Sequence, residues 1–218
     1  MTFNELREKS KDYPLFKLGD ILKWFSEAKK QTILNQLSSW KNKGWLEIIK
    51  RGVYKLKEFE IREPFVVANF IYSPSYISLE SALNYYSIIP DIPFGITSVT
   101  IKKTNQFKTK NFGVFYYRHI KPDLFFGYKT ILAGKNYSYN IALPEKALFD
   151  FFYLQGKGFS SFEGFIKELR LSLPKDFNWK RFSKWQKLVS TRNKTFHKLP
   201  DIYAEYNQTP PDKPQRHA

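Results

Sequence analysis

The sequence predicts a mixed α/β (α+β) protein with an N-terminal winged helix-turn-helix and a second α/β domain. Residues 15–56 have the order helix, turn, helix and short basic β-hairpin, which is the order of a winged helix. Residues 57–64 are charged and end in proline, as linkers often do. Beyond them β-rich and amphipathic helical segments are mixed, and the C-terminal segment is helical and basic. We therefore expect domains at residues 1–57 and 65–206.

Three short helices are expected before the hairpin. Residues 3–11 predict the first, which Pro14 ends, and residues 18–24 predict the second. Ser26 suits the N-cap of the third helix, whose apolar side chains recur at i, i+1, i+4 and i+7. The residues expected to face the core in that helix are Ile33, Leu34, Leu37 and Trp40.

A basic β-hairpin is expected after the third helix. Gly44 suits the left-handed position that ends a helix. Strands are predicted at residues 45–49 and 53–56, with Lys50, Arg51 and Gly52 in the turn between them. This hairpin is the expected wing.

The third helix leaves a polar face with side chains that suit the reading of DNA. Gln31 and Asn35 lie one turn apart, and both residue types can bond adenine through two hydrogen bonds. Thr32 suits a thymine methyl group or a phosphate. Lys29 and Lys30 would meet phosphates or guanines where the helix enters the groove. These five residues are the candidate readers of the major groove.

The expected wing places two more cations beside DNA. Lys50 and Arg51 would contact the backbone or the adjacent minor groove, for which Arg51 is the better candidate. The alternative is that the polar residues of the third helix form only a solvated face. The wing, the helical spacing and the local charge together favour DNA binding.

The second domain is expected to contain helices with recognisable ends. Ser78 suits the N-cap of a helix, and Pro144 suits the first position of a helix at residues 144–155. The helix after Ser78 would bury Leu79, Ala82, Leu83 and Tyr86. Further helices are predicted at residues 160–173 and 179–189.

Strands are expected between these helices. They are predicted at residues 96–102, 112–120, 128–132 and 137–143, with a polar hairpin loop at 103–110. The polar, proline-rich residues 207–218 predict a disordered tail.

Positive charge is concentrated at both ends of the chain, whose formal net charge is +16. Residues 1–57 contain 13 basic and 6 acidic residues, residues 58–156 contain 10 and 8, and residues 157–218 contain 13 and 6. Two basic ends around a nearly neutral middle suggest a nucleic-acid footprint, although a high lysine content alone explains the total. The basic segment 175–198 suits DNA, an acidic partner or a solvated face.

Composition excludes several classes of site. There are no cysteines, so disulfides, thiolate metal sites and a cysteine nucleophile are ruled out. The histidines, at 119, 197 and 217, lack metal-ligand spacing, and we expect no metal and no cofactor. No apolar run is long enough to cross a membrane, and the N-terminus lacks the apolar region of a secretion signal. We therefore expect a cytoplasmic protein that does not bind membranes.

Carboxylates of the second domain define an enzymatic alternative, a metal-dependent nuclease. Such an enzyme needs two or three acids around a divalent ion. Glu80 and Glu145 lie in the first turns of predicted helices, where the helix dipole alone favours a carboxylate. The other candidates are Asp91, Asp123 and Asp150. We expect no catalytic residue, and a pure protein-interaction module is the third hypothesis.

Two sequence blocks together resemble a known family. The first is the winged module that ends in WLEIIKRGVYKL. The second is YISLESALNYYSII, followed downstream by IALPEKALFDFFY. In this order they are similar to the AbiEi-type antitoxins, the transcriptional-regulator half of abortive-infection toxin–antitoxin pairs, over roughly residues 10–155. Ser87 stands where family members often have glycine, and the segment beyond residue 156 matches no family pattern.

The resemblance implies a type IV-like toxin–antitoxin or phage-defence pair. Family members look like autorepressors whose winged domain binds inverted repeats in double-stranded DNA, while the α/β domain counteracts a nucleotidyltransferase-like toxin. On this chain the DNA role would fall on residues 29–35 and on Lys50 and Arg51, in a monomer or a dimer assembled on DNA. Residues 78–83 and 144–150 would be structural signatures of the antitoxin domain. A stand-alone regulator without a toxin is the alternative.

Overall fold

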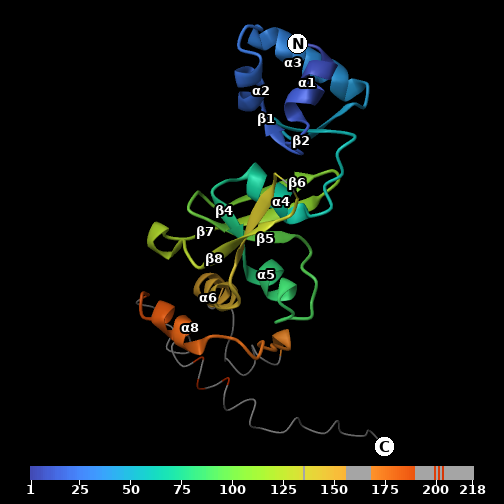
Figure 1. Cartoon of the computed structure of the whole chain (residues 1–218). Coiled ribbons are helices and arrows are strands. Elements are labelled where there is room, and N and C mark those ends of the chain that lie inside the picture. The colour runs from blue at the N-terminus through green and yellow to red at the C-terminus, as the bar shows by residue number, and fades with distance from the viewer. Residues whose placement is uncertain (135, 156–167, 190–198, 200, 202, 204–218) are drawn as a thin grey trace, which may run out of the picture. The chain divides into compact units, whose positions relative to one another are not determined.

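The computed structural model describes residues 1–134, 136–155, 168–189, 199, 201 and 203. Over these residues the chain forms helices and two β-sheets (Figure 1), which confirms the predicted mixed α+β class. The chain divides into two compact units, a first unit of residues 1–77 and 94–141 and a second of residues 78–93 and 142–218. The tail predicted at 207–218 and most of the helix predicted at 160–173 lie outside the described residues.

The first unit begins with three helices and a three-stranded antiparallel sheet of order β1-β3-β2. In chain order the elements are α1 (Phe3–Ser10), β1 (Phe16–Lys17), α2 (Leu18–Trp24), α3 (Lys30–Asn42), β2 (Leu46–Lys50) and β3 (Val53–Leu56). All three predicted helices and both hairpin strands are present, with bounds shifted by no more than a few residues. Their apolar faces form one core, made of Leu6, Phe16, Ile21, Ile33, Leu37, Trp40, Leu46, Tyr54 and Leu56.

The two ends of α3 differ in how well the sequence predicts them. The prediction of Ser26 as N-cap is wrong, because α3 begins after Lys29. A turn closed by the amide of Ala28 on the carbonyl of Phe25 precedes the helix, and the Ser26 hydroxyl bonds Glu27 instead. The prediction of Gly44 is confirmed, since its φ is +74°, which is the left-handed conformation that glycine adopts at low cost.

A six-stranded sheet of order β6-β7-β5-β4-β9-β8 completes the first unit. Its elements are α4 (Pro64–Ile71), β4 (Ser75–Ile77), β5 (Ile96–Thr100), β6 (Asn105–Thr109), β7 (Gly113–His119), the 3-10 helix η1 (Pro122–Leu124), β8 (Tyr128–Leu132) and β9 (Ser138–Ala142). The pairs β5–β7 and β4–β9 are parallel, and β4–β5 and β6–β7 are antiparallel. The prediction of a loop at residues 103–110 is wrong. The segment contains β6, an edge strand on which Asn105, Gln106 and Lys108 are exposed.

The second unit is helical where it is described. It contains α5 (Leu79–Tyr85), α6 (Pro144–Gln155) and α8 (Trp179–Gln186). Every side chain of α6 from Glu145 to Phe152 is buried, so this helix is enclosed on all sides. Across the described residues, every helix is too short or too polar to cross a lipid bilayer.

The end of α5 has a left-handed residue that is not glycine. Ser87 has φ +56°, and its amide bonds the carbonyl of Asn84 at 2.8 Å. The next amide, of Ile88, bonds the carbonyl of Leu83 at 2.8 Å, which completes a Schellman motif. The position where the resembled family often has glycine is therefore one whose backbone favours glycine.

Candidate nucleic-acid interface

Helix α3 has one apolar face and one polar, exposed face. Ile33, Leu37 and Trp40 are buried in the core. On the opposite face the Gln31 amide donates to the Asn35 side-chain oxygen at 3.0 Å. The other predicted readers on this helix, Lys29, Lys30 and Thr32, are exposed to solvent. The structure therefore places four of the five candidates on exposed positions of α3 and the fifth, Lys29, at its N-cap.

The two wing candidates differ in their surroundings. Arg51 is exposed beside Gly52, whose φ of +80° forms the hairpin turn. Lys50 is half-buried, and its Nζ lies 4.2 Å from the centroid of the Phe107 ring on β6. Of the two cations, Arg51 is therefore the one that already points into solvent.

Two further lysines lie close to Lys50 and were not singled out from the sequence. Lys50 Nζ and Lys102 Nζ lie 6.0 and 5.4 Å from the Tyr72 ring centroid, and Lys17 Nζ lies 5.0 Å from that of Phe70. Burial lowers the pKa of Lys50, and the charges of Lys17 and Lys102 lower it further. We call Lys17, Lys50 and Lys102 the lysine cluster. Its members come from distant parts of the sequence, so no local pattern signals it.

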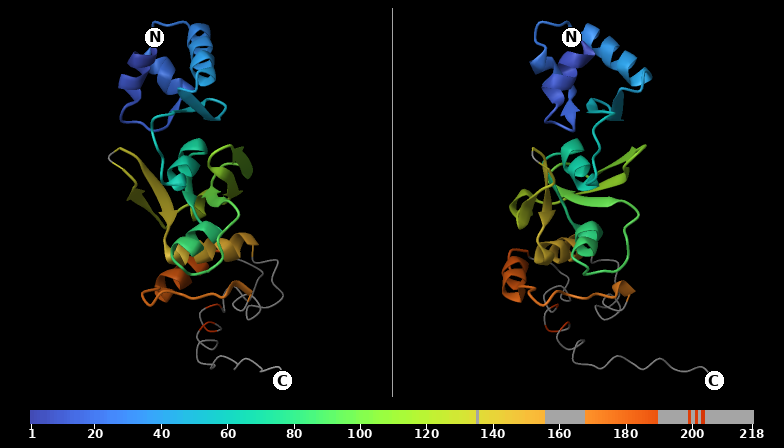
Figure 2. Two further views of the ribbon diagram at one scale, coloured as in Figure 1. Left: turned by 90° about the vertical axis from the view of Figure 1, so that its right-hand side faces the viewer. Right: turned by 45° about the vertical axis from the view of Figure 1, so that its right-hand side comes forward.

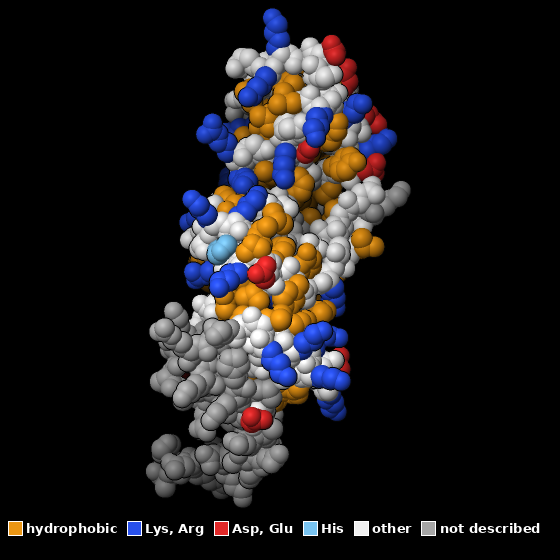
Figure 3. All heavy atoms as spheres, turned by 90° about the vertical axis from the view of Figure 1, so that its left-hand side faces the viewer, with side chains coloured by type: hydrophobic (Ala, Val, Ile, Leu, Met, Phe, Trp, Pro, Cys, Tyr) orange, Lys and Arg blue, Asp and Glu red, His pale blue; other side chains and the backbone are white. Residues whose placement is uncertain are grey.

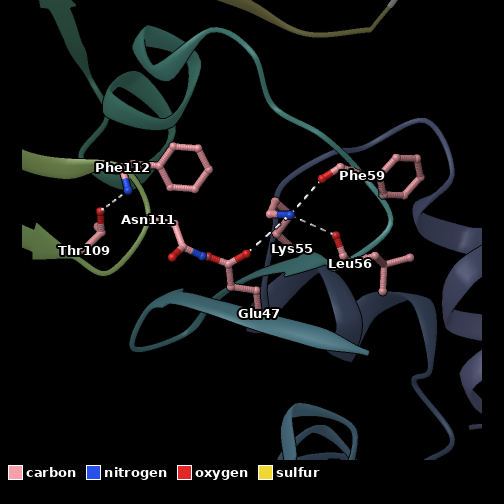
Figure 4. A network of polar contacts seen from close by, with 7 residues as sticks. All are labelled: Glu47, Lys55, Leu56, Phe59, Thr109, Asn111 and Phe112. Carbon is pink, nitrogen blue, oxygen red and sulfur yellow. Dashed lines mark hydrogen bonds and ion pairs between the residues drawn. The ribbon is translucent and has the colours of Figure 1, made fainter. Parts of the chain in front are cut away.

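A polar network holds the strands of the β2–β3 hairpin in place. Lys55 on β3 is buried, and its Nζ donates to the carbonyls of Phe59 at 2.8 Å and Leu56 at 3.2 Å. The same Nζ lies 3.4 Å from the Glu47 carboxylate on β2. Figure 4 shows Glu47 between Lys55 and Asn111, whose side-chain amide donates to it from the turn between β6 and β7. The segment after the hairpin is thereby fixed to β3, and the hairpin is joined to the turn between β6 and β7.

Basic side chains are prominent on the surface. Figure 3 shows one face of the molecule, on which Lys and Arg side chains stand among exposed apolar ones. In the second unit, α8 exposes Lys180, Arg181 and Lys184 while Phe182 is buried. The helix predicted at 179–189 thus has the basic outer face that its sequence suggests.

The two sequence blocks of the second domain meet in a buried polar cluster. The Ser78 hydroxyl donates to Asp150 at 2.8 Å, across 72 residues of sequence. The ammonium of Lys146, one turn before Asp150 on α6, bonds the other carboxylate oxygen. All three side chains have 0% exposure. Ser78 precedes α5 as predicted, but its side chain bonds Asp150 rather than the end of its own helix.

The remaining nuclease candidates are held in separate contacts. Glu145 accepts the backbone amide of Asn178 at 2.9 Å, and Glu80 accepts the side-chain amide of Gln155 at 2.8 Å. Asp91 pairs with Arg170 at 2.7 Å, and Asp123 lies in η1. Within the part of the chain that the structure describes, no three Asp, Glu or His side chains come together as metal ligands.

Comparisons with known proteins assign no further role to these residues. No known protein family matches the sequence, and no curated protein matches it.

Proposed function

We propose that this protein is a sequence-specific DNA-binding regulator whose N-terminal part is a winged helix-turn-helix. The observation that carries the proposal is the polar face of α3, where Gln31 and Asn35 contact each other in solvent while the opposite face is buried. A helix in the major groove presents side chains of this kind to base edges. The packed core behind α3 would hold them in a fixed orientation.

The order of the N-terminal elements supports the same proposal. Three helices precede a two-stranded hairpin, and β1 joins that hairpin to give the sheet order β1-β3-β2. In a winged helix the third helix enters the groove and the hairpin lies beside it, over the backbone. Residues 29–35 and Arg51 belong to those two elements, and together they form the proposed interface.

Phosphate contacts would supply most of the affinity. Lys29 and Lys30 at the start of α3 and Arg51 on the wing are exposed cations that suit phosphate groups. Lys50 can take part only by leaving the Phe107 ring. We therefore assign the minor-groove or backbone contact of the wing to Arg51.

We further propose that the protein is the antitoxin of a type IV-like pair, acting as autorepressor of its operon against a nucleotidyltransferase-like toxin. This step rests on the family resemblance of the two sequence blocks. The contact of Ser78 with Asp150 supports their interpretation as structural signatures, because it joins the blocks in one buried cluster. We assign no catalytic residue.

The test is a titration of the purified protein on its own upstream promoter DNA and on scrambled DNA, at two salt concentrations. We expect preference for the promoter and a loss of that preference in Gln31→Ala/Asn35→Ala. The matched control is Glu8→Ala/Lys11→Ala, which also removes one exposed side-chain pair without changing the net charge. Equal binding to both DNAs by the wild type would refute the recognition-helix assignment.

A second test addresses the antitoxin role. The neighbouring reading frame that is nucleotidyltransferase-like is expressed in cells with and without this protein. We expect growth arrest by that product alone and rescue by the full chain. Rescue by the Gln31→Ala/Asn35→Ala variant would separate the antitoxin activity from DNA binding. Growth arrest that persists beside the wild-type chain would overturn the antitoxin proposal and leave the regulator proposal standing.

A further inference from the structure

Strand β8 is an open edge of the six-stranded sheet. It is the last strand in the order β6-β7-β5-β4-β9-β8, so β9 is its only neighbouring strand among the described residues. Figure 2 shows the β8–β9 hairpin at the margin of the sheet. Four of the five β8 residues are exposed, and Leu132 has a relative accessibility of 78%. An edge of this kind is a template for pairing with another strand.

The two edge strands of the sheet, β6 and β8, differ in how far they are covered. At the opposite edge, β6 is covered in part by the wing, because Lys50 lies on Phe107 and β2 lies against β6. At the β8 edge, Lys129 is the only charged residue of the strand, and the strand contains no proline. Natural edge strands are usually protected by several such devices. The apolar exposure of β8 therefore indicates that this edge has a partner.

We propose that β8 pairs antiparallel with β8 of a second copy of this chain, centred on Thr130. This register pairs all five residues of the strand. It places Tyr128 opposite Leu132, Lys129 opposite Ile131, and Thr130 opposite Thr130 of the other copy. The contact is two-fold symmetric and would join two six-stranded sheets into one.

The charges of the strand select this register over its neighbours. Centring on Lys129 would put two ammonium groups directly opposite each other, which is destabilising. Centring on Ile131 would leave Tyr128 beyond the paired strands. In the Thr130 register each lysine lies opposite an isoleucine. The alkyl part of the lysine can cover the isoleucine side chain.

The apolar side chains of the strand also match in this register. Leu132, the most exposed residue of β8, would be covered by Tyr128 of the other copy. The Tyr128 ring is already held in position, stacked on Tyr76 at a centroid distance of 4.9 Å. A rigid ring opposite an exposed leucine is a favourable cross-strand pair.

The strength of the pairing is limited by its size. Two five-residue strands bury much less than the roughly 1,000 Å² expected of a stable interface. The second copy is therefore a weak partner in dilute solution, and pairing is favoured when two copies are held close together. If the proposed function is correct, two half-sites of an operator would hold two copies close together. The pairing itself does not depend on DNA.

The absence of cysteine from the natural chain makes a direct test possible. In the variant Thr130→Cys the proposed two-fold axis places the new thiols opposite each other, with Cβ atoms about 4.5–5.5 Å apart, so that a small shift of the strands allows a disulfide. We expect mild oxidation to give a covalent dimer. The matched control is Ile92→Cys, whose position is 87% exposed and lies outside the sheet. It should cross-link only through random collision, at least about tenfold more slowly.

A second substitution tests the register. Adding Leu132→Lys to Thr130→Cys removes the apolar pair with Tyr128 and should slow the cross-linking to the rate of the control. Circular dichroism checks that both variants are folded. Equal cross-linking rates for Thr130→Cys and Ile92→Cys would overturn the proposal, and cross-linking that Leu132→Lys does not slow would overturn the register.

Sedimentation of the wild-type chain provides the third readout. The average mass should rise with protein concentration, and it should not rise for Leu132→Lys. A mass that stays at one chain at every concentration would point to a different occupant of the edge, such as an extended peptide of another protein, and would overturn self-pairing. These assays contain no DNA, so their failure leaves the regulator proposal untouched, and loss of promoter binding leaves self-pairing untouched.

Discussion

Replacing Asp150 with asparagine tests whether the buried cluster of the second unit is an ion pair that must be kept intact. The substitution removes the carboxylate charge and keeps a side-chain oxygen that can accept from Ser78. Lys146 then loses its counter-charge at a position with 0% exposure. Because the surroundings exclude water, solvent cannot replace the lost counter-charge.

The expected cost follows from the burial of the pair. Removing one partner of a buried ion pair destabilises a protein by about 3–5 kcal/mol, because an uncompensated charge remains inside. The cost has a ceiling, since the lysine can lose its proton instead. For a lysine whose ordinary pKa is 10.5, deprotonation at about pH 7 costs about 5 kcal/mol. We therefore expect Asp150→Asn to lower the free energy of unfolding by about 3–5 kcal/mol.

The pH dependence of this cost has a definite sign. Burial lowers the pKa of Lys146, and the charge of Asp150 partly opposes this in the wild type. Without Asp150 the folded lysine releases its proton while the unfolded chain still holds it. Stability of the variant should therefore rise with pH, up to the unfolded pKa of about 10.5.

The assay is urea unfolding followed by circular dichroism, for the wild type, both single variants and the double variant. Lys146→Met alone leaves a buried carboxylate and should cost about as much as Asp150→Asn. The double variant Lys146→Met/Asp150→Asn removes both charges and should lie within about 1–2 kcal/mol of the wild type. Additive single effects, or a loss below about 1 kcal/mol for Asp150→Asn, would refute the reasoning.

Three further predictions follow from single positions. Ser87→Gly should raise the free energy of unfolding by about 0.5–1 kcal/mol, because the left-handed φ of +56° strains serine, and a lower melting temperature would contradict this. Burial raises the pKa of Tyr117, so stability should fall as the pH rises above 10.0, the ordinary pKa of tyrosine, where the unfolded chain gives up the proton first. Tyr117→Phe should flatten that decline in urea midpoints measured at about pH 9 and about pH 11, and an unchanged decline would count against it. Arg51→Ala should reduce the salt dependence of promoter affinity by about one phosphate contact, whereas an identical slope would remove Arg51 from the interface.

Local signals predicted much of the fold correctly. Gly44 ends α3 because a left-handed residue is needed there, and that requirement is visible in one residue type. Pro144 begins α6 for a similarly local reason, since its missing amide and fixed φ suit the first helical position. The spacing of apolar residues in α3 also identified its buried face. Each of these rules acts over a few residues.

Where local rules competed, the sequence was a poorer guide. Ser26 has the residue type of an N-cap, but a turn closed between Phe25 and Ala28 takes priority. The segment at 103–110 looked like a loop because an edge strand exposed to solvent needs few apolar residues. Phe107 is the exception there, and its ring packs on Tyr72 and Tyr117 beneath Lys50.

The candidate site shows the same division. The polar face of α3 could be predicted, because helical spacing alone determines which residues share a face. The lysine cluster and the bond of Ser78 to Asp150 could not. Each joins residues from distant segments, and only the folded topology brings them together.

The contact of Lys50 with Phe107 has a thermodynamic consequence for any DNA complex. If Lys50 moved to a phosphate, the energy of its contact with the ring would be lost, and the wing would be free of one attachment to β6. Linkage then requires reciprocity. A ligand or partner that stabilises the contact of β6 with the wing would lower the affinity for DNA by some factor. DNA would lower the affinity for that ligand or partner by the same factor. The Phe107 ring would thus determine how much free energy it costs to detach the wing from β6. It would also determine how strongly binding at the six-stranded sheet changes the affinity for the operator.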